Sequence, residues 1–289
     1  MTANARPGLV LRSRRFDWGR RTYVMGIVNV SPESFSGDGL SSVAGAVAQA
    51  RRFEAEGADI IDVGGQSTRP AVRAADASQP GFEILSVEDE IARVVPAIEA
   101  IVAATTLPVS IDAYRAAVVA AALDAGAHLV NDIWGFRHDP EVAALAAQRG
   151  VPAVVMHNQR GRDFHDVIGD VTAGFNESIR AARAAGLPRD QLILDPGFGF
   201  GWTVDQNLEM LRRLGELRAL GLPLLVGTSR KSTIGAVLDL PEDQRIWGTA
   251  ATVALSIANG ADIVRVHDVA AMKQVCVMTD AVVRPRPAS

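Results

Sequence analysis

Cysteine is nearly absent from this chain, since Cys276 is the only one in 289 residues. A single thiol excludes an intrachain disulfide and a metal cluster held by several thiolates, which is typical of proteins in the reducing cytoplasm. Cys276 lies in an apolar, helix-like segment near the C-terminus, so we expect its thiol to be buried and inert. We therefore expect a cytoplasmic protein.

Long apolar runs and an excess of positive charge are missing too. The chain has no stretch of about 18 apolar residues, and its first residues lack the apolar core of a signal peptide. The formal net charge is −4, which gives no electrostatic case for nucleic acid or an anionic membrane as a partner. Hydrophobic residues make up 48%, enough for a sizeable core in a soluble protein.

Eight short apolar runs, rich in β-branched residues, recur along the chain. Their near-continuous hydrophobicity is typical of parallel strands that are buried on both faces. Alanine-, arginine- and glutamate-rich segments of helical pattern separate them, and several of these end in Gly before the next run. The runs are residues 23–30, 59–65, 108–113, 128–133, 152–157, 191–197, 223–229 and 262–268.

Eight alternations of strand and helix predict an α/β fold, a (β/α)₈ TIM barrel, with a doubly wound open sheet as the second possibility. No low-complexity linker interrupts the pattern, so we expect a single barrel domain over residues 23–283. Residues 1–22 are the predicted N-terminal extension, a short hairpin that caps the bottom of the barrel. Residues 284–289 are the predicted frayed tail.

Polar residues mark the ends of these strands, where such barrels carry their chemistry. A single Asp or Asn there is a good helix cap, but Lys231, Arg265 and His267 are poor caps, so a convergent polar pocket explains the set better. Carboxylates and amides suit a planar heterocycle, and the cations suit an anionic group such as phosphate. The strand ends read Asn29, Asp62, Asp112, Asn131 with Asp132, Met156 with His157, Asp195, Ser229 to Lys231, and Arg265 with His267.

Lysine is also scarce, because only two of the 29 basic residues are lysine and the rest are arginine. One of the two, Lys231, stands between the apolar run 223–229 and a Ser-Thr-Ile-Gly turn. A place at the rim of the barrel predicts a specific role for Lys231 rather than that of an exposed surface charge. Arg230 beside it has two open roles, an outward salt bridge or a ligand contact.

Six motifs occur in order along this barrel pattern. They are MGIVNVSPESFSGDG from residue 25, GADIIDVGGQSTRP from 57, VSIDAYRAAVVAAALDAGAHLVNDI from 109, LDPGFGFGWTVDQNLEMLRRL from 194, LLVGTSRKSTIG from 224 and IVRVHDV from 263. Together they make the chain resemble the dihydropteroate synthase family, pterin-binding enzymes of folate biosynthesis, over residues 20–270. The resemblance implies condensation of 6-hydroxymethyl-7,8-dihydropterin pyrophosphate with p-aminobenzoate, giving 7,8-dihydropteroate and pyrophosphate.

The resemblance also implies roles for individual residues. A pterin site would be formed by Asp112, Asn131, Met156, Asp195, Phe200, Gly227 and Lys231. A p-aminobenzoate site would be formed by Phe35, Thr68, Pro70 and Ser232. Pyrophosphate would be held by Arg265 and His267, and by Asn29 through the implied cofactor Mg²⁺. The catalytic residues would be Lys231, Arg265, His267, Asp38 and Phe35.

The implied mechanism needs no protein nucleophile, because pyrophosphate leaves first and the neutral amine then attacks a cation-like pterin methylene. The motifs depart from the family pattern mainly in two loops. Asp38 is displaced by one position, Glu33 replaces the usual Asp, and Gln66 replaces a Glu. These departures leave the pterin residues intact, so the expected pterin site is unaffected by them.

Two other functions remain open. A methyltransferase of the same superfamily that acts on methyltetrahydrofolate would share the Asp and Asn residues of the pterin site, although residues 31–36 and 228–232 argue against it. A pterin-binding homologue without synthase activity is the non-enzyme alternative, which the shifted Asp38 and Gln66 keep open. The family is commonly dimeric, and the apolar segments 249–261 and 272–283 are suited to an interface, so we expect a homodimer.

Overall fold

The computed structural model describes residues 6–30, 42–66 and 85–284. Within them, eight parallel strands form one sheet in the order β8-β7-β6-β5-β4-β3-β10-β9. A parallel bridge from Leu194 to Leu224, next to β9, joins the two ends of that order and closes the sheet into a barrel. The predicted (β/α)₈ barrel is therefore confirmed, and the open sheet is wrong. The strands are β3 (Tyr23–Asn29), β4 (Ile60–Gly64), β5 (Val109–Asp112), β6 (Leu129–Asp132), β7 (Ala153–Met156), β8 (Leu192–Asp195), β9 (Leu225–Val226) and β10 (Ile263–Val266).

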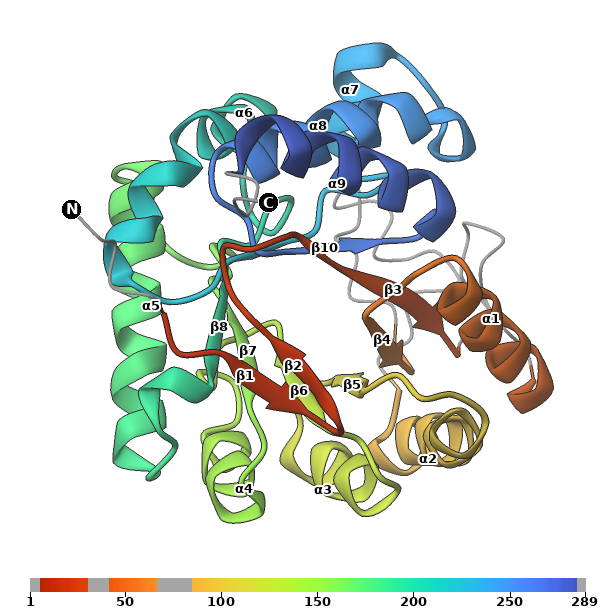
Figure 1. Ribbon diagram of the computed structural model, residues 1–289. Coiled ribbons are helices and arrows are strands. Elements are labelled where there is room, and N and C mark those ends of the chain that lie inside the picture. The colour runs from red at the N-terminus through yellow and green to blue at the C-terminus, as the bar shows by residue number, and fades with distance from the viewer. Residues whose placement is uncertain (1–5, 31–41, 67–84, 285–289) are drawn as a thin grey trace.

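The helices form an outer ring around the strands (Figure 1). Side-chain caps fix several starts: Ser86 and Asp166 accept from the first turns of α2 and α5, and Thr203 opens α6 with a capping box. No described helix is long and apolar enough to cross a membrane. The helices are α1 (Val43–Ala55), α2 (Val87–Ala104), α3 (Ala116–Asp124), α4 (Glu141–Arg149), α5 (Val167–Ala184), α6 (Val204–Arg213), α7 (Ser232–Leu238), α8 (Ile246–Ala258) and α9 (Val269–Val283).

The short helix α7 differs from the sequence-based expectation of a turn after Lys231. It spans 7 residues, about two helical turns, which is too short for a 3.6-residue period to appear in the sequence. The unit after β9 thus carries two helices, α7 and α8, before the chain enters β10. Because α7 begins at Ser232, Lys231 stands at the junction between the β9 loop and the helix.

A hairpin lies across the bottom of the barrel (Figure 1). Its strands β1 (Leu9–Leu11) and β2 (Arg14–Phe16) pair antiparallel. Apolar side chains of the hairpin pack in one buried cluster with a layer of inward-facing side chains near the start of seven barrel strands, so the lower half of the barrel is filled. The cluster consists of Leu9, Leu11, Phe16, Trp18, Tyr23, Met25, Ile60, Leu129, Val154, Ile193, Leu225 and Ile263.

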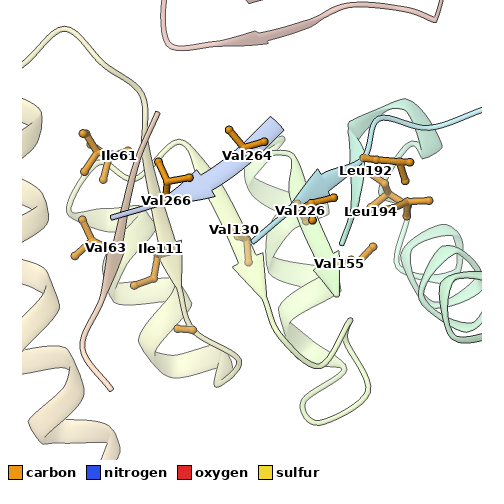
Figure 2. Close-up of a cluster of buried hydrophobic side chains, with 14 of the residues drawn as sticks. Ile61, Val63, Ile111, Val130, Val155, Leu192, Leu194, Val226, Val264 and Val266 are labelled. Atoms are coloured by element: carbon orange, nitrogen blue, oxygen red, sulfur yellow. The ribbon is translucent and has the colours of Figure 1, made fainter. Parts of the chain in front are cut away.

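The opposite faces of the strands form the larger core against the helices. Successive side chains of a strand point to opposite faces, so the neighbours of the inward layer belong to this second cluster. Figure 2 shows such side chains from seven strands: Ile61, Val63, Ile111, Val130, Val155, Leu192, Leu194, Val226, Val264 and Val266. This alternation determines which residues can reach the mouth of the barrel.

A buried carboxylate anchors the N-terminal segment to the start of β10. The Asp262 side chain is fully buried and accepts two bonds from the Arg6 guanidinium, at 2.6 and 2.7 Å. It also accepts from the backbone N–H groups of Gly19 and Leu224. One side chain therefore ties together the extension, the entry to β9 and the strand that carries Arg265 and His267.

Replacing this carboxylate, Asp262→Ala, is expected to lower the free energy of unfolding by about 3 kcal/mol. The substitution leaves buried N–H donors without an acceptor and the Arg6 guanidinium without its ion-pair partner. The matched control is Asp124→Ala, which removes a carboxylate from an exposed pair with Arg149 and should change stability by less than about 0.5 kcal/mol. Urea unfolding followed by circular dichroism measures both. Equal, small losses would show that Asp262 is not an anchor.

Candidate active site

The mouth of the barrel is lined by a second inward layer, one step above the apolar one. Because strand side chains alternate, the residues two positions after the inward hydrophobic ones also face inward. Above Ile60, Leu129, Ile193, Leu225 and Ile263 stand Asp62, Asn131, Asp195, Gly227 and Arg265. The same alternation that fills the lower barrel with apolar side chains therefore gathers polar groups at its carboxyl end.

A network of hydrogen bonds and ion pairs joins three of these side chains, Asp62, Asn131 and Arg265, to Asp112 of β5. Arg265 Nε donates to Asp62 Oδ2 at 2.6 Å, and Arg265 Nη2 donates to Asp112 Oδ2 at 2.6 Å. Asn131 Nδ2 donates to the same Asp62 oxygen at 3.1 Å. The other oxygens of both carboxylates, Asp62 Oδ1 and Asp112 Oδ1, are buried without a hydrogen-bond partner in the part of the chain that the structure describes. Both atoms are therefore acceptors to which no described residue donates.

Burial perturbs the charges of this network. It raises the pKa of the Asp112 carboxyl to about 7, with the Arg265 guanidinium lowering that pKa and the nearby Asp62 raising it. Burial also raises the pKa of Asp195, against the opposing effects of the Lys231 ammonium and the Gly197 N–H, which donates to Asp195 at 2.8 Å. The mouth therefore holds three carboxylates against the two cations Arg265 and Lys231, a net excess of one negative charge when all are ionised.

Lys231 reaches into this mouth from the start of α7. Its ammonium donates to the backbone carbonyl of Phe198 and lies 4.6 Å from the centre of the Phe200 ring. The loop after β8 leaves room for it, because a Cβ at Gly199, whose φ is +84°, would lie 3.0 Å from Lys231 Cδ. A Cβ at Gly227 would lie 3.9 Å from Lys231 Nζ. Both glycines thus border the path of the lysine side chain.

The end of β10 carries the other expected cations. His267 Nδ1 lies 2.9 Å from Ser229 Oγ, and its backbone N–H also donates to that hydroxyl, so Ser229 orients the ring. Arg230 forms an ion pair with Asp268, with its Nη2 at 2.7 Å and its Nε at 3.0 Å from the carboxylate oxygens. Of the two roles open for Arg230, the structure therefore shows the salt bridge.

Apolar side chains form one wall of the mouth. Met156 and Phe200 pack in a buried cluster with Ile133, and Tyr114 and Trp134 lie against it. Asn29 ends β3, and its Cα is paired in register with that of Gly64. Ser232 is the first residue of α7. The predicted residues Phe35, Asp38, Thr68 and Pro70 lie outside the described residues.

Sequence reasoning missed several parts of this geometry. Asp62 was noted only as a polar strand end, yet it is fully buried and bonded to two predicted ligand residues. Strand alternation could have found it, since it stands two positions after the inward Ile60. Asp132, by contrast, accepts from the N–H groups of Trp134 and Phe136, both at 2.7 Å, and so fixes the loop after β6.

Two buried groups take no part in the network. Burial lowers the pKa of His157 to about 4, and its Nε2 lies 2.8 Å from Gln159 Oε1, so the neutral ring packs beside Trp202. His157 also lines a cavity of about 150 Å³ beside α5, which none of the network carboxylates lines. Cys276 lies buried in α9, where burial raises the pKa of its thiol to about 12, as expected for an inert cysteine.

The fold and site define a class, a TIM-barrel enzyme whose mouth presents buried acceptors beside a lysine and an arginine. A model of the family described as "Pterin binding enzyme" matches residues 25–267, and the chain belongs to this family. The predicted resemblance is therefore confirmed.

The relatives in that family are dihydropteroate synthases. One from Synechocystis sp. is 47% identical over 287 residues, covering 96% of each chain. A solved dihydropteroate synthase from Clostridium difficile, determined in the presence of pteroic acid, superposes with a TM-score of 0.86 and is 43% identical in sequence. The match covers 93% of this chain and 100% of that one. Another, from Xanthomonas albilineans with 4-aminobenzoic acid, has a TM-score of 0.85 and 39% identity, covering 96% of this chain and 98% of its own.

The raised pKa of Asp112 predicts an unusual titration. In the free protein its carboxyl should lose its proton near pH 7 rather than near the ordinary value of 3.8, because burial disfavours the ionised form. Carbon-13 NMR of aspartate carboxyl groups between pH 4 and pH 9 measures this, and Asp112→Asn assigns the resonance. Asp166 is the internal control, since its hydrogen bond from Arg213 lowers its pKa. An Asp112 resonance that titrates together with Asp166 would contradict the prediction.

Proposed function

We propose that this chain condenses 6-hydroxymethyl-7,8-dihydropterin pyrophosphate with p-aminobenzoate, as its relatives named dihydropteroate synthase do. The observation that carries the proposal is the set of buried acceptors in the mouth, above all Asp112 Oδ1, which no described residue supplies with a donor. A buried acceptor without a partner costs free energy, and a ring N–H bonded there would remove that cost. A pterin edge, with an amino group beside a ring N–H, has the donors that such a pocket lacks.

The leaving group and the methylene make opposite electrostatic demands. When the C–O bond breaks, its electron pair leaves with pyrophosphate and the pterin methylene becomes cation-like. The excess negative charge among Asp62, Asp112 and Asp195 favours that cation, while Arg265 and the Ser229-oriented His267 are suited to the departing anion. The amine nitrogen of p-aminobenzoate then forms the new bond to carbon and loses one proton. No side chain needs to act as a nucleophile.

Asn29 fits the expected Mg²⁺. Its amide oxygen is a hard, neutral ligand at the carboxyl end of β3, and its side chain forms no hydrogen bond with any other described residue. Mg²⁺ typically takes few protein ligands and completes its shell with water and phosphate oxygens, so one amide is a sufficient anchor. The ion would supply charge neutralisation at the pyrophosphate. The chain's own part would be to hold the phosphates at the rim while Asp112, Asn131 and Asp195 hold the ring below.

Lys231 is proposed to contact both substrates. Its ammonium already bonds the Phe198 carbonyl and faces the Phe200 ring, which keeps it between the acceptor pocket and the start of α7. From there it can donate to the pterin and to the carboxylate of p-aminobenzoate, whose site is proposed to include Ser232. The remaining proposed p-aminobenzoate residues belong to the segments outside the described ranges.

The decisive test is pyrophosphate release from the dihydropterin pyrophosphate with Mg²⁺, with and without p-aminobenzoate. Release should require p-aminobenzoate and should stop when Mg²⁺ is chelated. Lys231→Met should lower kcat/KM by at least about 100-fold, or about 2.7 kcal/mol, through loss of a charge-bearing contact.

The other lysine provides the matched control. Lys273 lies on α9 near Asp59, away from the mouth, so Lys273→Met should change kcat/KM by less than about twofold. Binding of the pterin without any pyrophosphate release would contradict the proposed synthase and leave a pterin-binding homologue. Release that is equally fast without p-aminobenzoate would contradict the proposed condensation of the two substrates.

We also propose that the chain works in the cytoplasm as a homodimer. Helices α8 and α9 pack side by side and expose large apolar side chains, with Trp247 80%, Leu255 55%, Val277 61% and Met278 65% exposed. An exposed apolar surface of this kind is typical of an interface. A second copy of the chain is the occupant that the dimeric family favours.

A charge placed on this surface should dissociate the dimer. Wild-type protein is expected to sediment as a dimer in analytical ultracentrifugation, and Val277→Lys as a monomer at the same concentration, because an unpaired ammonium would be buried. Val10→Lys is the control: Val10 is 59% exposed, as Val277 is 61%, but lies on the hairpin. A monomeric wild type, or dissociation by both variants, would overturn this assignment.

A further inference from the structure

We propose that Asp62 is a positioning residue that fixes which end of the Asn131 amide faces the ligand, and so makes the mouth select a ring bearing an amino group. The inference rests on the proposed pterin site and adds a residue to which the family resemblance gave no role. Asp62 is fully buried on β4 and lies against both Asn131 and Arg265.

The donors and acceptors of the two side chains determine how the Asn131 amide is oriented. An ionised carboxylate only accepts hydrogen bonds, whereas the amide of Asn carries an accepting oxygen at one end and a donating NH₂ at the other. Arg265 Nε lies 2.6 Å from Asp62 Oδ2, and because a guanidinium only donates, this oxygen acts as an acceptor. The end of the Asn131 amide that lies 3.1 Å from the same oxygen must therefore be the NH₂ group. The opposite orientation would place two oxygens against each other in a buried site.

This orientation leaves the oxygen of the Asn131 amide, and not its NH₂ group, facing the ligand. With Nδ2 engaged, Asn131 Oδ1 is the end available, and no described residue donates to it. It joins the unpartnered Asp112 Oδ1 and the carboxylate of Asp195, so that the mouth presents a set of acceptors. A ring with an amino group next to a ring N–H matches this set, and a ring with a carbonyl in place of the amino group meets another oxygen. A buried polar mismatch of this kind discriminates strongly between ligands.

Arg265 makes the arrangement rigid. Its guanidinium is planar and bonds Asp62 and Asp112 through different nitrogens, which fixes both carboxylates relative to each other. Asp62 is thereby held at the place from which it orients Asn131. If Asp62 served only to anchor Arg265, its replacement would weaken all ligands alike and leave the preference for the amino group unchanged.

The test is Asp62→Asn, assayed for ligand selectivity. Asp62 Oδ2 receives both Arg265 Nε and Asn131 Nδ2, and a neutral amide oxygen in its place is a weaker acceptor beside a new NH₂ group, so the Asn131 amide should no longer be held with its oxygen toward the ligand. Calorimetry should compare 6-hydroxymethylpterin with its analogue that carries a 2-oxo group in place of the 2-amino group. We expect the ratio of the two affinities to fall at least about tenfold in Asp62→Asn.

A double-mutant cycle separates this role from a general one. On an Asn131→Ala background, Asp62→Asn should leave the ratio unchanged, because the residue through which it acts is gone. An unchanged ratio in Asp62→Asn alone, with overall affinity reduced, would overturn the inference and leave Asp62 as an anchor for Arg265. A wild type that binds neither ligand would instead contradict the proposed function.

A second measurement does not depend on any variant. A neutron diffraction structure of the wild-type protein in D₂O distinguishes ND₂ from oxygen. We expect the deuterons of Asn131 on the side that faces Asp62. Deuterons on the opposite side would overturn the inference even if Asp62→Asn fails to fold.

Discussion

The mouth of this barrel depends on one guanidinium shared between two buried carboxylates. Arg265 stands on β10, whereas Asp62 and Asp112 stand on β4 and β5, and β10 pairs only with β3 and β9. The ion pairs therefore join strands that share no backbone hydrogen bonds, because β3 lies between β10 and β4 in the sheet. Without the guanidinium, two buried carboxyl groups would lie near each other in a poorly solvated site with no opposite charge between them. With it, Asp62 Oδ2 and Asp112 Oδ2 both accept from the same cation.

The same network separates two electrostatic regions. Below the rim, carboxylates outnumber cations, and burial raises the pKa of Asp112 and Asp195. At the carboxyl end of β10, Arg265 and the neighbouring His267 are groups suited to an anion. A reaction in which a carbon becomes cation-like while an anion departs uses both regions at once. Arg265 belongs to each of them, so its position couples the recognition of the ring to the departure of the leaving group.

The sequence predicts the barrel and its polar rim for physical reasons that act locally. Parallel strands buried on both faces must read as apolar runs, and helices between them must carry their own stop signals, so eight runs such as 59–65 and 262–268 were visible. The pairing of Arg265 with Asp62 and Asp112 was not predicted, because it depends on closure of the sheet, which brings β10 beside β3 and so near β4 and β5. Motif comparison assigned Arg265 to the anion alone. Helix α7 was missed because so short a helix has no detectable period.

Lys231 at the mouth occupies a gap that suits a lysine but not an arginine of the same charge. Arginine is the usual cation of this chain, yet the position at the start of α7 is lysine. The space there is bounded by the Phe200 ring, the Phe198 carbonyl and Gly199, where a Cβ would lie 3.0 Å from Lys231 Cδ. A compact ammonium on a flexible stem can enter such a gap and turn its donors toward two partners, whereas a planar guanidinium needs a wider slot and fixes the direction of its donors. Glycine at 199, where φ is +84°, serves the backbone and the lysine together, since any Cβ there would be strained and would also displace the stem. The lysine and the loop that admits it therefore form one structural unit.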